Sequence, residues 1–471
     1  MNETNFEGKL NNMKNRLSTV LFVFITTFIV NAQTWQIVGS AGFTAAGIDH
    51  PSFVFSSNDE PYIAFKDGAN NNKASVMMFD GSSWSLVGSA GFSSGFAGWT
   101  SLALNNNDEP FVAFRDASNS NKVTVMKYDG SNWITVGSPG FSGPTQQDNI
   151  SIKFNSSNEP YVAFKEYNPE NNIINKATVM KYDGTNWEMV GTAGITFASN
   201  ISLAFNSSDE PYIAFRDGGN GNRASVMKFD GTAWVAVGTS GFSAAGSEYT
   251  SLAFNSNNEP FVAYRDAGNS DKVSVMKFDG TNWLTVGTAG FSAGIASHTS
   301  LSFNSNNEPY VAFREFVSGS IQNQATVMKF DGTNWVAVGA PGFSAGYADL
   351  TCLAINSIDE PYVAFVDLTQ LYKATVMKYG NGEAGISNLF NVKNNISVYP
   401  NPTTNIAYVQ SNDILSDATV SIKNSIGQEV KHYTHLSGNL LEINLEKEIS
   451  GIYFIEVKTM NSTQVIKLIK D

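Results

Sequence analysis

The sequence predicts an all-β protein: a seven-bladed β-propeller of four-stranded blades, closed by its N-terminal strand and followed by a small C-terminal β-sandwich. Two observations predict the propeller. A segment similar to Asp279-Gly-Thr-Asn-Trp283 recurs about every 50 residues, and each unit holds four short runs of β-branched and aromatic residues. Because a single four-stranded sheet cannot bury both of its faces, such units stack radially as blades.

Two markers allow the repeats to be counted. The tryptophans that begin each fourth strand are Trp35, Trp84, Trp133, Trp187, Trp234, Trp283 and Trp335. The glutamates that precede a proline are Glu60, Glu109, Glu159, Glu210, Glu259, Glu308 and Glu360. Both counts predict seven blades.

The unit at residues 250–287 illustrates the expected strands in order. They are Thr250–Phe254, Pro260–Asp266, Lys272–Phe278 and Trp283–Val286. Each is bounded by Asn, Asp, Gly or Pro, which favour tight turns. In the Asp-Gly-Thr-Asn turn before the fourth strand, Asp can accept hydrogen bonds from backbone amides and Gly supplies a positive φ. The region has no sustained apolar period of 3.6 residues, so we expect almost no helix.

The two ends of the array predict how the ring closes. Trp35 begins a fourth-strand motif that no first three strands precede, whereas the last unit, Thr351–Tyr379, lacks a fourth strand. We therefore expect Trp35–Val38 to pair with the strand that ends at Tyr379. This pairing would remove the open edges of the sheet array.

Composition excludes several classes of function. The formal net charge is −13, and residues 33–391 carry 32 acidic and 19 basic residues. Nucleic acid is not an expected partner, because phosphate binding needs clustered Lys and Arg. Cys352 is the only cysteine, which excludes an intramolecular disulfide and a cysteine-based zinc site. His50 and His298 fall on blades that are not adjacent, so we expect no metal and no cofactor.

The N-terminal segment, residues 1–32, has the pattern of a signal peptide. Lys14 and Arg16 precede the apolar run Leu17–Val30, and small residues before Gln33 suit cleavage. The first twelve residues lack the character of such a signal, which makes Met13 an alternative start. The propeller is expected over residues 33–380.

The C-terminal part of the chain differs from the repeats. Residues 381–395, rich in Gly and Asn, indicate a linker. Residues 396–471 contain short alternating strands and four motifs in order: Val398-Tyr-Pro-Asn-Pro402, Ile426-Gly-Gln-Glu-Val430, Ser450-Gly-Ile-Tyr-Phe454 and Val465-Ile-Lys-Leu-Ile-Lys470. These motifs resemble the type A sorting domain of type IX secretion substrates. The resemblance implies recognition by the type IX secretion machinery, with the cargo secreted or attached to the outer cell surface.

A basic residue followed by an acid ends most second strands. The pairs are Lys66-Asp67, Arg115-Asp116, Lys165-Glu166, Arg216-Asp217, Arg265-Asp266 and Arg314-Glu315. An arginine beside carboxylates and aromatic rings can bind sugar hydroxyls, and the same pairs can instead form salt bridges between blades. The arginines at 115, 216, 265 and 314 are candidate ligand-binding residues.

Variation within a repeated scaffold gives further candidates, because packing constrains equivalent positions alike. Just before each first strand the equivalent residues are His50, Trp99, Asn149, Asn200, Tyr249, His298 and Leu350. They are expected to line one face of the ring, with Trp99, Tyr249 and His298 as candidate ligand contacts. The two longest hairpins between second and third strands, Glu166–Lys176 and Glu315–Gln324, have no functional interpretation from sequence.

The repeats also resemble the propeller lectins related to fucose-binding lectins, on the basis of the Arg-Asp pairs and the blade tryptophans. That resemblance implies sugar sites between blades. An enzyme needs one distinguished site, whereas these residues are distributed over seven blades. The leading hypothesis is therefore an exported, non-catalytic propeller that binds glycans or surface proteins multivalently. The alternatives are a polysaccharide hydrolase or lyase, and a protein adhesion module without a small ligand.

Overall fold

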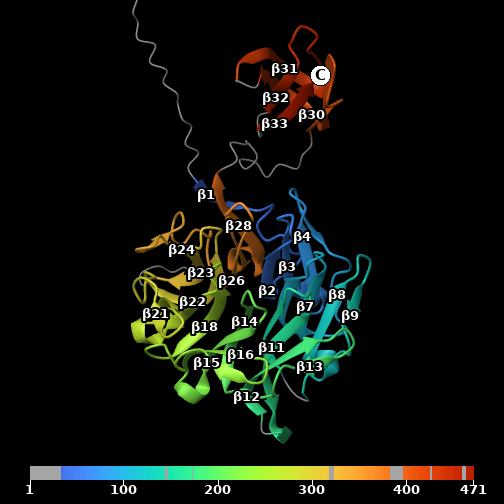
Figure 1. Cartoon of the computed structure of the whole chain (residues 1–471). Coiled ribbons are helices and arrows are strands. Elements are labelled where there is room, and N and C mark those ends of the chain that lie inside the picture. The colour runs from blue at the N-terminus through green and yellow to red at the C-terminus, as the bar shows by residue number, and fades with distance from the viewer. Residues whose placement is uncertain are drawn as a thin grey trace, which may run out of the picture. The chain divides into compact units, whose positions relative to one another are not determined.

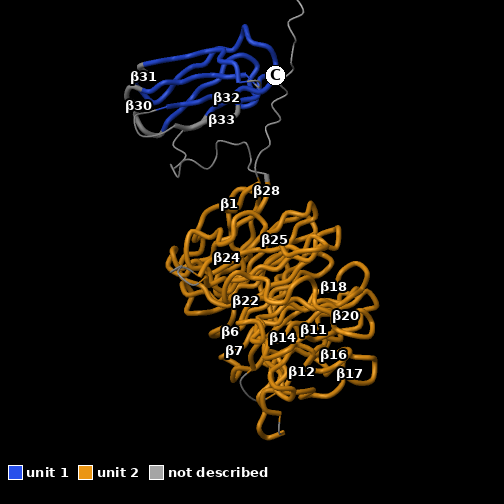
Figure 2. Tube along the Cα trace, turned by 90° about the vertical axis from the view of Figure 1, so that its left-hand side faces the viewer, with its two compact units in different colours: residues 1–31, 381–471 blue, residues 32–380 orange. Residues whose placement is uncertain are grey.

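The computed structural model describes residues 33–143, 147–171, 173–317, 323–381, 396–424, 427–458 and 463–471. The chain divides into a propeller unit, Ala32–Gly380, and a second unit that contains Asn381–Asp471 (Figure 2). The expected signal peptide lies outside the described residues, as does almost all of the expected linker. Helix within the described part is limited to six 3-10 turns of three residues each.

Seven sheets of four antiparallel strands form the propeller unit (Figure 1). Blade 1 consists of β2 (Ile48–Phe55), β3 (Pro61–Asp67), β4 (Lys73–Phe79) and β5 (Trp84–Leu86). Blade 2 consists of β6 (Ala97–Leu104), β7 (Pro110–Asp116), β8 (Lys122–Tyr128) and β9 (Trp133–Thr135). Blade 3 consists of β10 (Asp148–Phe154), β11 (Pro160–Asn168), β12 (Ile173–Tyr182) and β13 (Trp187–Met189). Blade 4 consists of β14 (Ala198–Phe205), β15 (Pro211–Asp217), β16 (Arg223–Phe229) and β17 (Trp234–Ala236). Blade 5 consists of β18 (Ser247–Phe254), β19 (Pro260–Asp266), β20 (Lys272–Phe278) and β21 (Trp283–Thr285). Blade 6 consists of β22 (Ile295–Phe303), β23 (Pro309–Phe316), β24 (Asn323–Phe330) and β25 (Trp335–Ala337). Blade 7 is β26 (Ala348–Ile355), β27 (Pro361–Asp367), β28 (Lys373–Asn381) and β1 (Gln33–Ile37).

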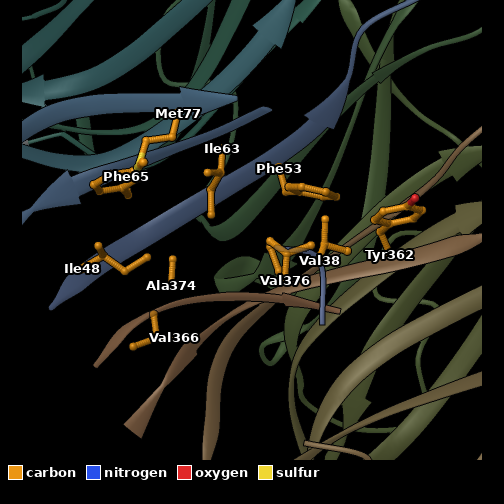
Figure 3. Packing of buried hydrophobic residues seen from close by; sticks show 11 residues of the cluster. Val38, Ile48, Phe53, Ile63, Phe65, Met77, Tyr362, Val366, Ala374 and Val376 are labelled. Carbon is orange, nitrogen blue, oxygen red and sulfur yellow. The ribbon is translucent and has the colours of Figure 1, made fainter. Parts of the chain in front are cut away.

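The N-terminal strand closes the ring, as the sequence predicts. Strand β1 pairs with β28, and the two lie side by side in Figures 1 and 2. The backbone amide of Val38 donates to the carbonyl of Val376 at 2.9 Å. Figure 3 shows Val38 among Phe53 of blade 1 and Val376 and Tyr362 of blade 7. The first and last blades therefore share one hydrophobic core.

Second strands are buried on both faces because each lies inside a blade that has a neighbour on either side. In β19, the five residues Pro260–Tyr264 are all buried, with Val262 and Ala263 fully inaccessible. This explains why the second strands are continuous apolar runs without the polar alternation of a half-exposed strand.

The blade tryptophans pack between neighbouring blades. Trp283 donates its indole Nε1–H to the carbonyl of Val237 in the preceding blade at 2.7 Å, and its ring stacks on Phe242 at 4.1 Å. All seven make the equivalent indole hydrogen bond. These residues therefore hold blades together, and their rings are not free platforms for sugars.

The turn before each fourth strand has the geometry expected from sequence. In blade 5, Asp279 Oδ1 accepts the backbone amides of Thr281 and Asn282 at 2.8 and 2.7 Å, and Gly280 has φ +97°. The glutamate before each Pro stabilises the turn between the first and second strands. In blade 5, Glu259 Oε2 accepts a hydrogen bond from the side-chain amide of Asn255 at 2.6 Å. These recurring carboxylates shape turns.

The C-terminal unit is all-β. Its strands are β29 (Ile396–Tyr399), β30 (Ile406–Asn424), β31 (Glu429–Asn444), β32 (Gly451–Lys458) and β33 (Thr463–Lys470). The long β30 and β31 change register several times where they pair. Residues of both ends of β30, such as Val409 and Ile422, are buried in a single core with Tyr453.

Candidate functional site

A bulge at the start of every first strand positions the candidate residues. In blade 5 the strand begins at Ser247, three residues before the predicted Thr250, and its register shifts between Glu248 and Ser251. Tyr249, within the shift, has a left-handed backbone with φ 54°. The equivalent residues of the other blades have φ between 47° and 54°. Because bulges re-aim side chains, this position leaves the regular in-and-out alternation of the strand.

The seven re-aimed side chains meet in one pocket on the ring axis. The cavity has a volume of about 280 Å³, and His50, Trp99, Asn149, Asn200, Tyr249, His298 and Leu350 all line it. Two aromatic pairs stand in its wall: the rings of His50 and Trp99 are 4.4 Å apart, and those of Tyr249 and His298 are 4.5 Å apart. We call this cavity the axial pocket.

Carboxylates stand next to the two histidines of the axial pocket. Asp49 lies 3.2 Å from His50 Nδ1 and 2.9 Å from Lys66 Nζ. Burial alone would raise the pKa of Asp49, but hydrogen bonds from His50 and Lys66 outweigh it and hold that pKa far below its ordinary value. Asp349 similarly lies 3.2 Å from His298 Nδ1.

His298 is uncharged at neutral pH. Burial lowers its pKa to about 4, and the positive charge of Arg314 acts in the same direction while Asp349 opposes it. Burial raises the pKa of Tyr249, so its hydroxyl stays protonated. His298 and Tyr249 therefore present neutral hydrogen-bonding groups and aromatic rings to the pocket.

Hydrogen bonds between neighbouring blades make the pocket rim rigid. Thr351 Oγ1 donates to the carbonyl of His298 at 2.6 Å, and the amide of Asn200 donates to Asn149 Oδ1 at 2.7 Å. Thr100 donates in the same way to the carbonyl of His50.

The basic and acidic residues that end the second strands do not pair with each other. Asp217 is buried and accepts from the amide of Gly219 at 3.0 Å and from Ser225 Oγ at 2.6 Å. It caps the 3-10 turn η4 (Gly218–Asn220). Consecutive strand residues point to opposite faces, so the adjacent Arg216 points away from it.

The basic residues instead reach acids at the start of the first strands. The pairs are Lys66–Asp49 (2.9 Å), Arg115–Asp148 (2.7 Å), Lys165–Asp148 (3.2 Å), Arg265–Glu248 (3.0 Å) and Arg314–Asp349 (2.6 Å). The Arg115 and Arg314 pairs join neighbouring blades. Three candidate arginines are therefore engaged by carboxylates, whereas Arg216 has no ion pair or hydrogen bond among the described residues.

Histidines and carboxylates of the described residues do not form a cluster of three that could hold a metal ion. His50 and His298 are close enough to influence each other electrostatically, although they lie on blades 1 and 6. Each has an aspartate beside it, and the two aspartates are held by Lys66 and Arg314.

Comparison with known proteins identifies the C-terminal unit. Residues 397–471 match the family described as secretion system C-terminal sorting domain, which confirms the type IX sorting domain expected from sequence. This domain indicates secretion or attachment to the outer surface. Within the described residues, no helix has the length and apolar character needed to span a membrane. No curated protein matches the sequence.

The propeller is similar to several solved structures at low identity. A protein of unknown function from Dyadobacter fermentans DSM 18053 is 14% identical over 63% of this chain and 97% of its own, with a TM-score of 0.42. A mutant of the Aleuria aurantia lectin in complex with Fucalpha1-6GlcNAc is 16% identical over 66% and 100%, with a TM-score of 0.41. An alpha-L-arabinanase of Penicillium chrysogenum complexed with arabinobiose is 11% identical over 74% and 98%, with a TM-score of 0.42. Both a lectin and a glycoside hydrolase are thus among the similar proteins.

The structure brings together some candidates and separates others. Trp99, Tyr249 and His298 share the axial pocket. Arg216 lies in a different cavity, between blades 3 and 4, with Phe197 and Asn175, which sequence reasoning missed. A signal for this cavity was present, because the connection Gly191–Asn200 is shorter than its equivalent Gly238–Tyr249.

Proposed function

We propose that this protein is an exported glycan-binding propeller whose principal site is the axial pocket. The observation that carries the proposal is the convergence of Trp99, Tyr249, His50 and His298 with two asparagines in one cavity. Sugars pack their apolar faces on aromatic rings, and amide and imidazole groups offer both donors and acceptors to hydroxyls. A concave site with a few convergent polar groups is the usual form of a ligand pocket.

The placement of the acidic side chains supports binding over hydrolysis. Glycoside hydrolysis by the common route needs two carboxyl groups that flank the scissile bond. Among the described residues that line the axial pocket there is no Asp or Glu. Asp49 and Asp349 contact the histidines, are not among the lining residues, and form ion pairs with Lys66 and Arg314.

The number of sites follows from the differences between blades. Seven equivalent arginine sites would give multivalent binding, but Arg115, Arg265 and Arg314 already have carboxylate partners. We therefore propose one axial site per chain, with any avidity arising from several chains on a surface.

A glycan array probed with the full chain, followed by calorimetry on the hits, tests this function. Trp99→Ala and Tyr249→Ala should each weaken binding by about tenfold, because each removes a stacking face. Tyr372→Ala is the matched control: Tyr372 is 58% exposed and lies outside the pocket lining, so its loss should leave the affinity unchanged. Absence of any glycan hit with folded protein would contradict the proposal and favour protein adhesion.

A second candidate function is elimination on an acidic polysaccharide, favoured by the Tyr249–His298–Asp349 arrangement. Neutral His298, oriented by Asp349 at 3.2 Å, could take the proton on the carbon next to a uronate carboxylate. Tyr249 could then protonate the oxygen that leaves as the double bond forms. Incubation with acidic polysaccharides would give ultraviolet absorbance from the conjugated product, and His298→Ala would abolish it.

A further inference from the structure

The six basic residues at the ends of second strands differ in one respect. Five have a carboxylate within 3.2 Å, and Arg216 has none among the described residues. Asp49 faces Lys66 and Glu248 faces Arg265 across the first and second strands, whereas Ser199 faces Arg216. A serine opposite the cation does not explain this by itself, because Ser297 faces Arg314, which pairs with Asp349 of the next blade. Among the described residues, Arg216 has neither an opposing acid nor an acid partner from the next blade. Blade 4 therefore keeps the cation and lacks its counterion.

Arg216 opens into a cavity of about 440 Å³ between blades 3 and 4, which we call the inter-blade pocket. Lys165, Asn175, Phe197, Ser199 and Asn222 contribute to its lining, together with Ala198 and Gly218, and no acidic side chain does. The Arg216 Nε is buried without a hydrogen-bond partner.

The positively charged residues at and next to the inter-blade pocket outnumber the carboxylates that pair with them. Lys165 shares its partner, Asp148, with Arg115, whose Nη1 is the closer at 2.7 Å against 3.2 Å for Lys165 Nζ. Three cations, Arg115, Lys165 and Arg216, thus have one carboxylate between them. A half-buried guanidinium without a counterion is a site of positive potential, in a protein whose net charge is −13.

An aromatic ring stands at the edge of the same pocket. Phe197 is 49% exposed. At the equivalent position in blade 2, Phe96 is covered by Lys66 at 4.9 Å, and in blade 7 Arg314 covers Tyr347 at 5.2 Å. The corresponding cation, Lys165, makes no such contact with Phe197; Lys176 of the blade 3 hairpin lies over the ring instead, and about half of the residue is still exposed.

Two departures from the repeat build this pocket. The shortened connection Gly191–Asn200 carries Phe197, and the long hairpin of blade 3 carries Asn175. Asn175 lies where the register between β11 and β12 shifts, and its backbone is left-handed with φ 54°. Neighbouring Lys176 places its ammonium 5.5 Å from the Phe197 ring.

We propose that the inter-blade pocket binds an anionic saccharide, with Arg216 on its carboxylate or sulfate group. A guanidinium presents a fork of donors that matches the paired oxygens of such a group. The exposed face of Phe197 suits the apolar face of the sugar ring, and Asn175, Asn222 and Ser199 can bond its hydroxyls. The saccharide part rests on the proposed glycan-binding function, and the preference for an anion rests on Arg216 alone.

Calorimetry of the full chain tests this pocket with three probes of equal length: a galacturonate oligosaccharide, a sulfated galactose oligosaccharide and a neutral galactose oligosaccharide. At least one acidic probe should bind more tightly than the neutral one, and its affinity should fall as salt is added. The two acidic arms distinguish carboxylate from sulfate. Arg216→Ala should weaken the acidic probe by about ten- to a hundredfold.

Two further variants separate recognition from folding. Ser199→Asp introduces the acid that blades 1, 3 and 5 have opposite the basic residue, so it should pair with Arg216 and abolish acidic binding in a fully folded protein. Arg265→Ala removes a paired arginine at the equivalent position of blade 5 and should leave acidic binding unchanged.

The outcomes separate this inference from the axial site. Loss of acidic binding in Trp99→Ala but not in Arg216→Ala would place the acidic probe on the axis and overturn the inference. Equal affinity for neutral and acidic probes would also overturn it. Binding of free acetate or sulfate as tight as the oligosaccharides would show an anion site without sugar recognition, which contradicts the saccharide part.

Discussion

Trp35 donates its indole Nε1–H to the carbonyl oxygen of Val338 at 2.7 Å, although 303 residues separate them. The Trp35 ring also stacks on Phe343 with 3.8 Å between centroids. Through these contacts the first strand of the chain completes the last blade and is held against blade 6. The ring is thus closed by a strand that is covalently attached to blade 1 and hydrogen-bonded within blade 7.

Trp35→Ala should loosen this closure. Removal of a large, half-buried ring and its indole hydrogen bond should lower the free energy of unfolding by about 3 kcal/mol. Because β1 is the edge strand of its sheet and β28 is its one partner among the described strands, the amides of β28 should also lose protection from hydrogen exchange. Urea unfolding and exchange measured by mass spectrometry report these two effects.

Trp234→Ala is the matched comparison, since Ile195 stands where other blades place a stacking phenylalanine. Its loss should cost less, about 2 kcal/mol, and leave β28 protected. Unchanged exchange in β28 of Trp35→Ala would show that closure does not depend on this ring.

Repetition made most of the fold predictable. Each blade must bury the same strands against its neighbours, so the apolar runs recur at Ile63, Val112 and Val262 and are fully inaccessible in all three. The unmatched ends of the array predicted the closure for the same reason. The start of the first strand in blade 5 was placed three residues too late, because the bulge at Tyr249 interrupts the alternation from which strands are recognised.

The candidate site was only partly predictable. Trp99 and His298, at a position that varies between blades, both line the axial pocket. The basic and acidic neighbours, such as Arg216 and Asp217, suggested either sugar sites or salt bridges between blades, but not which acid each basic residue reaches, since adjacent strand residues point to opposite faces. Which acid reaches which arginine depends on contacts across strands and blades, so the lone cation at Arg216 is visible only in three dimensions.

Asp148 should contribute more to stability than an ordinary surface carboxylate. It forms ion pairs with both Arg115 and Lys165, and its side chain is only 19% exposed. Asp148→Asn leaves two half-buried cations without a counterion and should cost about 2 kcal/mol. Asp271→Asn is the control, because Arg265 keeps Glu248 as a second partner, and it should cost under about 1 kcal/mol. Equal urea midpoints for the two variants would contradict this reasoning.

The only thiol of the chain should react slowly in the folded state. Cys352 occupies the position that is serine in the other six blades, and its Sγ lies 3.2 Å from the carbonyl oxygen of Pro51. Cys352 lines the axial pocket and is partly exposed, but burial of its thiol raises the pKa to about 12, so little thiolate forms at neutral pH. Reaction with an aromatic disulfide reagent should be roughly a thousandfold slower than in urea-unfolded protein. Comparable rates in the two states would mean that the thiol is accessible in the folded protein. The Cys352→Ser variant, which has no thiol, is the control for background reaction of the reagent.

His298 should make stability depend on pH between about 6.5 and about 4. Its pKa is lowered from 6.5 to about 4 in the folded protein. Between these two pH values the imidazole of His298 is therefore mostly protonated in the unfolded chain and mostly neutral in the folded chain. Protonation then favours unfolding, and the free energy of unfolding should fall by up to roughly 3 kcal/mol as the pH drops through this window.

Carboxylates titrate in the same pH range, so the informative quantity is the difference in the free energy of unfolding between the wild type and His298→Asn. That difference, measured by urea unfolding at about pH 7 and about pH 4, should shift by the same amount in favour of the variant. A difference that stays constant with pH would show that His298 is protonated as readily in the folded ring as in water, and the neutral imidazole assigned to the axial pocket would be wrong.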